Sequence, residues 1–187
     1  MSANDQEALQ ARFGDSILES VVFRGEHTVV VALQDLRAVL EHAATDLGFE
    51  LLVDVCSLDH FGEDPRFEVV YELATVDDSR HLRVRAAVPE ETEVPSVADI
   101  WATANWHERE VFDMMGIVFS DHPNLERILM WKGYPYYPLR KDFPLAGKPS
   151  EMPDVAFSGV APLEGGPFVT SPGSDRVTGE PRAKGES

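Results

Sequence analysis

The chain has 187 residues, 43% of them hydrophobic, and a formal net charge of −17. This composition is sufficient for one domain with a hydrophobic core, and it argues against wholesale disorder. The charge disfavours binding to nucleic acid or to anionic lipid, because both present phosphate, and no run approaches the ~20 apolar residues of a membrane span.

The first half of the sequence predicts two strands, a helix and a third strand. Residues 17–33 form two short apolar runs around a turn at Arg24–His27. Apolar residues then recur at helical spacing from Leu33 to Leu47. Residues 49–59 predict a mostly buried strand in which Cys56 is a small buried residue. As the only cysteine, it can form no intrachain disulfide and cannot by itself hold an iron–sulfur cluster.

The middle of the sequence predicts a hairpin and a second helix. Residues 66–76 and 80–89 alternate between apolar and polar side chains and are joined by a short polar turn, so they are expected to pair, with one face wet. The second helix is predicted from Pro95 to Met115. A turn or short helical piece follows at 122–130, and the proline- and aromatic-rich stretch 131–149 is expected to be extended and irregular.

This order of elements predicts an α+β fold. One mixed or antiparallel sheet is expected to carry two main helices, followed by an extended irregular C-terminal segment. Residues 1–149 are expected to form this domain. Residues 150–187 are rich in Gly, Pro, Ser and acid and lack a periodic apolar pattern, so they are expected to be an extended tail that wraps a partner.

The stretch NWHEREVFDMMGIVF, residues 105–119, places charges among core residues. On a helical projection, Glu108 falls on the apolar face. The opposite, polar face carries Trp106, Arg109, Glu110 and Asp113. A carboxylate among apolar side chains must be neutralised or paired, so two features of this helix need an explanation: a buried glutamate and an exposed tryptophan.

A buried ion pair with Arg127 or Arg140 is the expected explanation for Glu108. An interface contact and a general-acid role are the alternatives. Arg109 and Asp113, four residues apart on the polar face, are expected to form a surface pair.

Trp106 and the aromatic residues of the proline-rich run are expected to form an exposed patch that marks a binding surface. The alternative is that the run, residues 134–143, folds back onto its own sheet.

Metal chemistry has little support in the sequence. The tetrapeptide HERE, residues 107–110, begins like the zinc-protease pattern H-E-x-x-H, but Val111 stands where the second histidine is needed. His107 and Glu110 could supply two ligands, and no second such pair is present to build a di-metal bundle. A small independent metalloenzyme around this pair remains an alternative.

Residues 104–145 contain a long ordered pattern. It comprises Glu108-Arg109-Glu110, Asp113, Gly116-Ile117, His122-Pro123, Arg127-Ile128-Leu129 and Arg140-Lys141-Asp142-Phe143-Pro144. The pattern resembles the signature of the 30-kilodalton, or C-type, subunit of respiratory complex I, the proton-translocating NADH:quinone oxidoreductase. Two departures are visible: Glu126 stands where the family usually has a basic residue, and Tyr136 and Tyr137 stand where it often has Gly-His.

The resemblance implies a structural subunit of the hydrophilic arm, with no catalytic residues, cofactor or metal of its own. Electrons would pass from NADH through FMN and iron–sulfur clusters in other subunits to quinone. The implied partners are chiefly the D-type subunit, which shapes the quinone cavity, and the B-type and I-type subunits, which carry clusters. The implied location is the cytoplasmic face of the bacterial inner membrane, reached through these partners and without a span of its own.

The implied structural and interface residues are Trp106, Glu108, Arg109, Glu110, Asp113, His122, Arg127, Arg140, Lys141 and Asp142. The equivalent subunit of a ferredoxin-linked quinone oxidoreductase, or of a membrane-bound hydrogenase, is the alternative within the same fold, because other subunits choose the electron donor.

Overall fold

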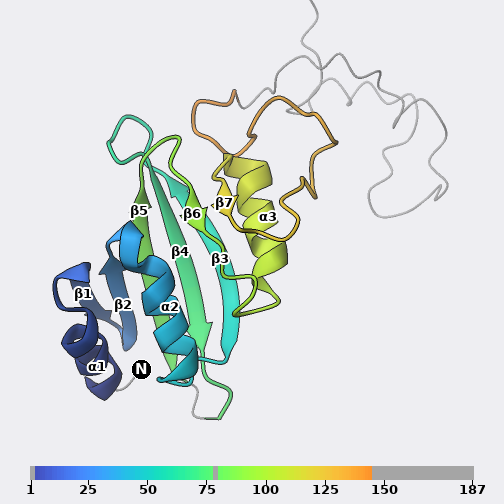
Figure 1. The fold of residues 1–187 in the computed structure, drawn as a ribbon. Coiled ribbons are helices and arrows are strands. Elements are labelled where there is room, and N and C mark those ends of the chain that lie inside the picture. Colours follow the sequence, from blue (N-terminus) through green and yellow to red (C-terminus); the bar gives the residue numbers. More distant parts are fainter. Residues whose placement is uncertain (1–2, 78–79, 145–187) are drawn as a thin grey trace, which may run out of the picture. The chain divides into compact units, whose positions relative to one another are not determined.

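A mixed sheet of five strands forms the centre of the fold (Figure 1), in the order β1-β2-β5-β4-β3. The computed structural model describes residues 3–77 and 80–144. The helices and strands named below all lie within the unit Met1–Lys141. The strands are β1 (Ile17–Phe23), β2 (Glu26–Val31), β3 (Leu51–Asp59), β4 (Phe67–Ala74) and β5 (His81–Val88). This confirms the predicted α+β fold and the two predicted hairpins.

One long connection makes the sheet mixed. β2 and β5 run parallel, whereas the other neighbours in the sheet are antiparallel. After β2 the chain forms a short 3₁₀ turn, Leu33–Asp35, and then helix α2 (Leu36–Thr45). α2 lies across one face of the sheet and leads to β3 at the far edge (Figure 1). This face is therefore the buried one.

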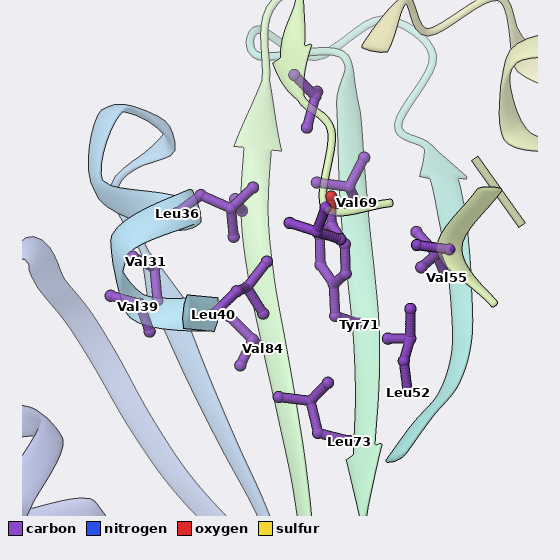
Figure 2. Packing of buried hydrophobic residues seen from close by; sticks show 14 of the residues in the cluster. Val31, Leu36, Val39, Leu40, Leu52, Val55, Val69, Tyr71, Leu73 and Val84 are labelled. Atoms are coloured by element: carbon purple, nitrogen blue, oxygen red, sulfur yellow. The ribbon is translucent and has the colours of Figure 1, made fainter. Parts of the chain in front are cut away.

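The core lies between α2 and the sheet (Figure 2). Leu36, Val39 and Leu40 of α2 point towards the strands and are fully buried. Tyr71 of β4 and Val84 of β5 meet them from the sheet and are also fully buried. Burying each such aliphatic side chain stabilises the fold by about 1.5–3 kcal/mol. The contacts of α2 with the apolar side chains of β4 and β5 therefore hold the helix on the sheet.

The opposite face of the β4–β5 hairpin is charged. Arg85 lies 2.7 Å from Glu68, and Arg83 pairs with Glu72, in each case across the hairpin. Cross-strand pairs of opposite charge stabilise a sheet and keep its open face polar. The predicted wet face is therefore confirmed for β5, whereas Glu68 and Val70 on the same face of β4 are buried.

Helix α3 (Ala104–Met115) packs beside β3 (Figure 1) and is shorter than predicted. The predicted start at Pro95 is wrong because Val94–Pro95 forms a short strand, β6, parallel to β7 (Phe119–Ser120). Turns separate β6 from α3. The helix ends at Gly116, which has φ of +75° and forms the left-handed C-cap that glycine favours.

Two further predictions need correction. An N-terminal helix, α1 (Ala3–Phe13), was not predicted, because little of it besides Leu9 and Asp5 enters the interior. β3 is not mostly buried: it is an edge strand, and Cys56 on it is exposed rather than buried. The predicted tail, 150–187, and the boundary before it lie outside the described residues. None of the helices described is both long and apolar enough to cross a membrane.

Candidate functional site: a segment anchored along helix α3

The segment that follows β7 runs along α3 and is hydrogen-bonded to it at intervals of one turn. The ring nitrogen Nε2 of His122 lies 3.1 Å from the carbonyl oxygen of Asn105. One turn further, Nε of Arg109 donates to the carbonyl of Glu126 at 3.0 Å. The acceptor at Glu126 is its backbone, so the replacement of the family's usual basic residue leaves this contact intact. Residues 122–126 are thereby aligned with the helix.

Asp113, one turn beyond Arg109, makes the strongest anchor. Its carboxylate accepts from Nη1 of Arg127 at 2.6 Å. It also accepts from the backbone N–H groups of Ile128, Leu129 and Met130 at 2.9, 2.6 and 2.9 Å. Burial favours the neutral form, but the three backbone donors and Arg127 outweigh it and hold the pKa of Asp113 below its ordinary value.

The predicted surface pair of Arg109 and Asp113 is therefore wrong. The Asp113 side chain is fully buried, because the segment covers the side of the helix on which it lies. The guanidinium of Arg109 instead lies 4.8 Å from the ring centre of Trp106. A projection of the helix alone could not show this burial.

Arg127 organises the aromatic residues of the proline-rich run. Its guanidinium carbon lies 6.0, 5.7 and 5.0 Å from the ring centres of Phe112, Tyr134 and Tyr137. Tyr134 also makes an edge contact with Trp131. The tyrosines are half-buried. The expectation of an exposed tyrosine patch is wrong, since the run folds back onto its own chain.

Other apolar side chains of this region face solvent. Trp106 is 62% exposed, as predicted, and Leu129 and Leu139 are exposed to 61% and 59%. Trp131 is 37% exposed. We call Trp106, Leu129, Trp131 and Leu139 the exposed apolar set. Isolated exposed leucines are ordinary, but two tryptophans and two leucines on one helix and its anchored segment are typical of a binding surface.

The segment returns to α3 at its C-terminal end. The N–H of Leu139 donates to the carbonyl of Met114 at 3.1 Å, and Nε of Arg140 donates to the carbonyl of Met115 at 2.6 Å. Carbonyls of the last helical turn have no partner within the helix, so these two bonds satisfy groups that α3 leaves open.

Gly116 makes this return possible. A Cβ atom at this position would lie 2.6 Å from Nη2 of Arg140 and from the ring of Tyr137. Only a residue without a side chain permits this approach, and glycine also adopts the positive φ of the position at little cost.

Asp59 and Arg66 complete the anchoring, and sequence reasoning missed both. Arg66 donates to the two Asp59 oxygens at 2.9 and 3.0 Å, and the N–H of Lys141 donates to Asp59 at 2.8 Å. The hydrogen bonds from Arg66 and, with a smaller effect, from Lys141 lower the pKa of Asp59 and outweigh the opposite effect of burial. No local pattern indicates a contact between residues 82 positions apart.

Glu108 is fully buried, as predicted, but the predicted arginine partner is wrong. Its carboxylate accepts from Oγ of Ser96 at 2.6 Å and from the N–H of Val97 at 2.8 Å. Arg127 is committed to Asp113, and Arg140 to the end of α3. Glu108 therefore fixes the turn before α3 without a cation, and burial raises its pKa in spite of the two hydrogen bonds.

His122 does not supply the missing charge. Its Nε2 lies 3.8 Å from Glu108 but makes its shorter contact with Asn105. Its Nδ1 accepts from the N–H of Asn124 at 3.0 Å, which assigns the proton of a neutral ring to Nε2. Burial lowers the pKa of His122 and further favours the neutral ring. Burial raises the pKa of the Tyr71 hydroxyl, and the nearby charge of Glu108 adds to this effect.

The remaining sequence candidates lie at the surface. Glu110 and Asp142 are exposed. His107 approaches Asp54 at 3.0 Å. Within residues 3–77 and 80–144, no group of three or more His, Cys, Asp or Glu side chains is arranged to hold a metal ion. The metalloenzyme hypothesis therefore finds no ligand set in this part of the chain.

Comparison with known proteins identifies the family. The family model for the 30-kDa subunit of respiratory-chain NADH dehydrogenase matches residues 29–149. The NADH-quinone oxidoreductase C-type subunit of Geotalea uraniireducens is 43% identical over 154 residues, which cover 81% of this chain and 94% of that protein. A C-type subunit of the same oxidoreductase from Rhizobium etli is 39% identical over 160 residues, 83% of this chain and 84% of the relative. The chain belongs to this 30-kDa subunit family.

A solved structure shares the fold. It is a chain in the membrane-bound sulfane sulfur reductase, an archaeal respiratory membrane complex. The TM-score is 0.64 at 24% identity, and the match covers 75% of this chain and 84% of that one. At this level of identity the likeness concerns the fold alone.

Replacing Asp113 by Ala should lower the free energy of unfolding by about 3–5 kcal/mol near neutral pH, because Arg127 loses its buried partner. The folded pKa of Asp113 is lowered, so its contribution is present above the ordinary value of 3.8 and is lost as the pH falls through the folded pKa. Denaturant unfolding at several pH values should show the difference shrinking in acid. Glu110→Ala, at an exposed residue of the same helix, is the control. A stability difference between Asp113→Ala and the unaltered chain that does not change with pH would contradict this account.

Glu108 is expected to change the stability with pH in the opposite direction, and Glu108→Gln tests this. Burial raises the folded pKa, so stability is greatest below the ordinary value of 4.5 and declines as the pH rises through the folded pKa. An amide of the same shape carries no charge, so the variant should be more stable than the unaltered chain at neutral pH and no more stable in acid. Thermal unfolding from acid to neutral pH measures this. Lower stability of the variant at neutral pH would contradict this account, because the ionised carboxylate would then stabilise the fold.

Gly116→Ala should be more destabilising than Gly25→Ala by about 1–3 kcal/mol. Both glycines have positive φ, but a Cβ at Gly25 would meet nothing within 4 Å. The comparison separates the effect of backbone strain from that of the clash with Arg140 and Tyr137. Equal losses of unfolding free energy for the two variants would contradict the close approach of Arg140 and Tyr137 to Gly116.

Proposed function

We propose that the chain is a structural subunit of the hydrophilic arm of a proton-translocating NADH:quinone oxidoreductase. The observation that carries this proposal is the use of the signature charges. The buried carboxylates of Glu108 and Asp113, and that of Asp59 outside the signature, bind backbone N–H groups of the same chain, while Trp106 remains exposed. Charges used in this way position a surface.

The proposal assigns the redox chemistry to other subunits. FMN, iron–sulfur clusters and quinone would be bound by partners, chiefly the D-type subunit at the quinone cavity and the B-type and I-type subunits with their clusters. Support comes from the family resemblance and from the names of the relatives. The sequence adds that Cys56 is the only thiol, too few for a cluster. Attachment to the cytoplasmic face of the inner membrane would be indirect, through these partners.

The equivalent subunit of a ferredoxin-linked or hydrogenase complex is the second candidate. The observation that favours it is the shared fold with a chain of the archaeal sulfane sulfur reductase complex. Affinity capture of the tagged full chain from its native cell discriminates the two. Recovery of an NADH-binding flavoprotein with quinone-reducing subunits supports the first candidate, recovery of a complex without it supports the second, and recovery of neither refutes both.

Trp106→Ala should reduce the amount of assembled complex severalfold, because buried tryptophans at interfaces contribute about 2 kcal/mol or more. NADH:quinone turnover per assembled complex should not change. Phe23→Ala, at another highly exposed aromatic residue (66%), is the matched control and should leave assembly intact. Normal assembly of Trp106→Ala with a large fall in turnover would instead place this helix in the chemistry.

A further inference from the structure

Arg140 differs from most partly buried arginines of the chain. Carboxylate partners are found for Arg37, Arg66, Arg80, Arg83, Arg85 and Arg127. Among the described residues no carboxylate lies within 4.0 Å of the Arg140 guanidinium, although the side chain is half-buried. Withdrawing a cation from water without a counter-charge is costly, so a half-buried arginine without a carboxylate partner in its own chain is suited to a partner on another molecule.

The surroundings of Arg140 leave one direction of approach. Its guanidinium lies 5.1 Å from the ring centre of Phe67 and 4.4 Å from that of Tyr137. Nε is used by the carbonyl of Met115. Because aromatic rings contact the guanidinium group and Nε is occupied, the donors left for a further partner are the terminal Nη atoms, to which a carboxylate can bind.

A cavity of about 110 Å³ adjoins Arg140. Its walls combine apolar side chains with a few polar ones: Phe67, Val88, Pro89, Ile117 and Val118, then Thr92, Glu91 and Glu93. Apolar walls reduce the access of water and strengthen an ion pair formed inside. Leu139, the residue before Arg140, belongs to the exposed apolar set.

We propose that this cavity receives a carboxylate group, an aspartate or glutamate side chain, from another subunit of the complex and pairs it with Arg140. This inference rests on the proposed function, because it requires a partner at this face. Glu91 and Glu93 in the wall are exposed and do not pair with Arg140. Both repel an incoming anion, so a carboxylate that docks here must be held in place by the other contacts of an interface.

The first test uses Arg140→Lys in the native complex. A carbodiimide joins a lysine amine to a carboxylate in direct contact: the amide bond forms, and the reagent takes up the released water to become a urea. Peptide mass spectrometry should find residue 140 joined to an aspartate or glutamate of another subunit. An amide only to Glu91 or Glu93, or no amide at residue 140, would overturn the proposal.

The second test compares two arginines. Arg24 also stacks on an aromatic ring, that of Phe23 at 5.3 Å, but it lies in the turn before β2 and does not line this cavity. Arg140→Gln should reduce recovery of the complex about tenfold relative to Arg24→Gln. Equal recovery of the two variants would contradict the proposal. Thermal unfolding of the free chains confirms that both fold. If Arg140→Gln does not fold, the cross-linking result decides.

The sign of the docked charge is tested by neutralising the wall. Glu91→Gln with Glu93→Gln should strengthen capture of the partner, since two repulsive charges are removed, and capture weakened by this change would point to a cationic group instead. Failure of the unaltered chain to capture any respiratory subunit would refute the proposed function itself, which distinguishes that outcome from failure at Arg140 alone.

Discussion

The buried carboxylate of Asp113 is the constraint on which the arrangement around α3 depends. An ionised carboxylate in the interior is stable only when donors surround it. Here they come from Arg127 and from the backbone of the three residues after it, so one side chain fixes an irregular segment against a helix. The positions of Leu129 and of the aromatic cluster around Arg127 follow from that contact. The same logic recurs at Asp59, which holds Lys141, and at Glu108, which holds the turn at Val97.

These anchors give the run of charges around α3 a structural use. A segment such as 122–141 contains no strand or helix of its own and cannot be held by ladder hydrogen bonds. Side chains take the place of backbone pairing. Carboxylates accept from N–H groups of the segment, and arginines donate to carbonyls of the segment and of the helix end. The result is a defined surface whose exposed members, Trp106 and Leu129, are available to a partner. We infer that the signature encodes this geometry.

The sequence predicted the sheet and α2 well because alternation and helical spacing are local signals, and β5 buries one face in strict alternation. It predicted the burial of Glu108 for the same reason. It failed where the environment comes from distant residues. Asp113 was assigned to the surface because the covering segment is not part of the helix. The partners of Asp59, Arg66 and Lys141, are separated from it by a loop and by 82 positions, respectively. Cys56 was misplaced because nothing local marks β3 as an edge strand.

Amide hydrogen exchange in the free chain tests the central claim most directly. If Asp113 holds the segment before any partner binds, the amides of Ile128, Leu129 and Met130 exchange slowly near neutral pH. The amides of Gly62 and Asp64, in an exposed loop, provide the internal reference for fast exchange. Protection of all three amides is the predicted result. Exchange of the three amides at the rate of the loop reference would contradict the account, because the segment would then be ordered by its partner and not by α3.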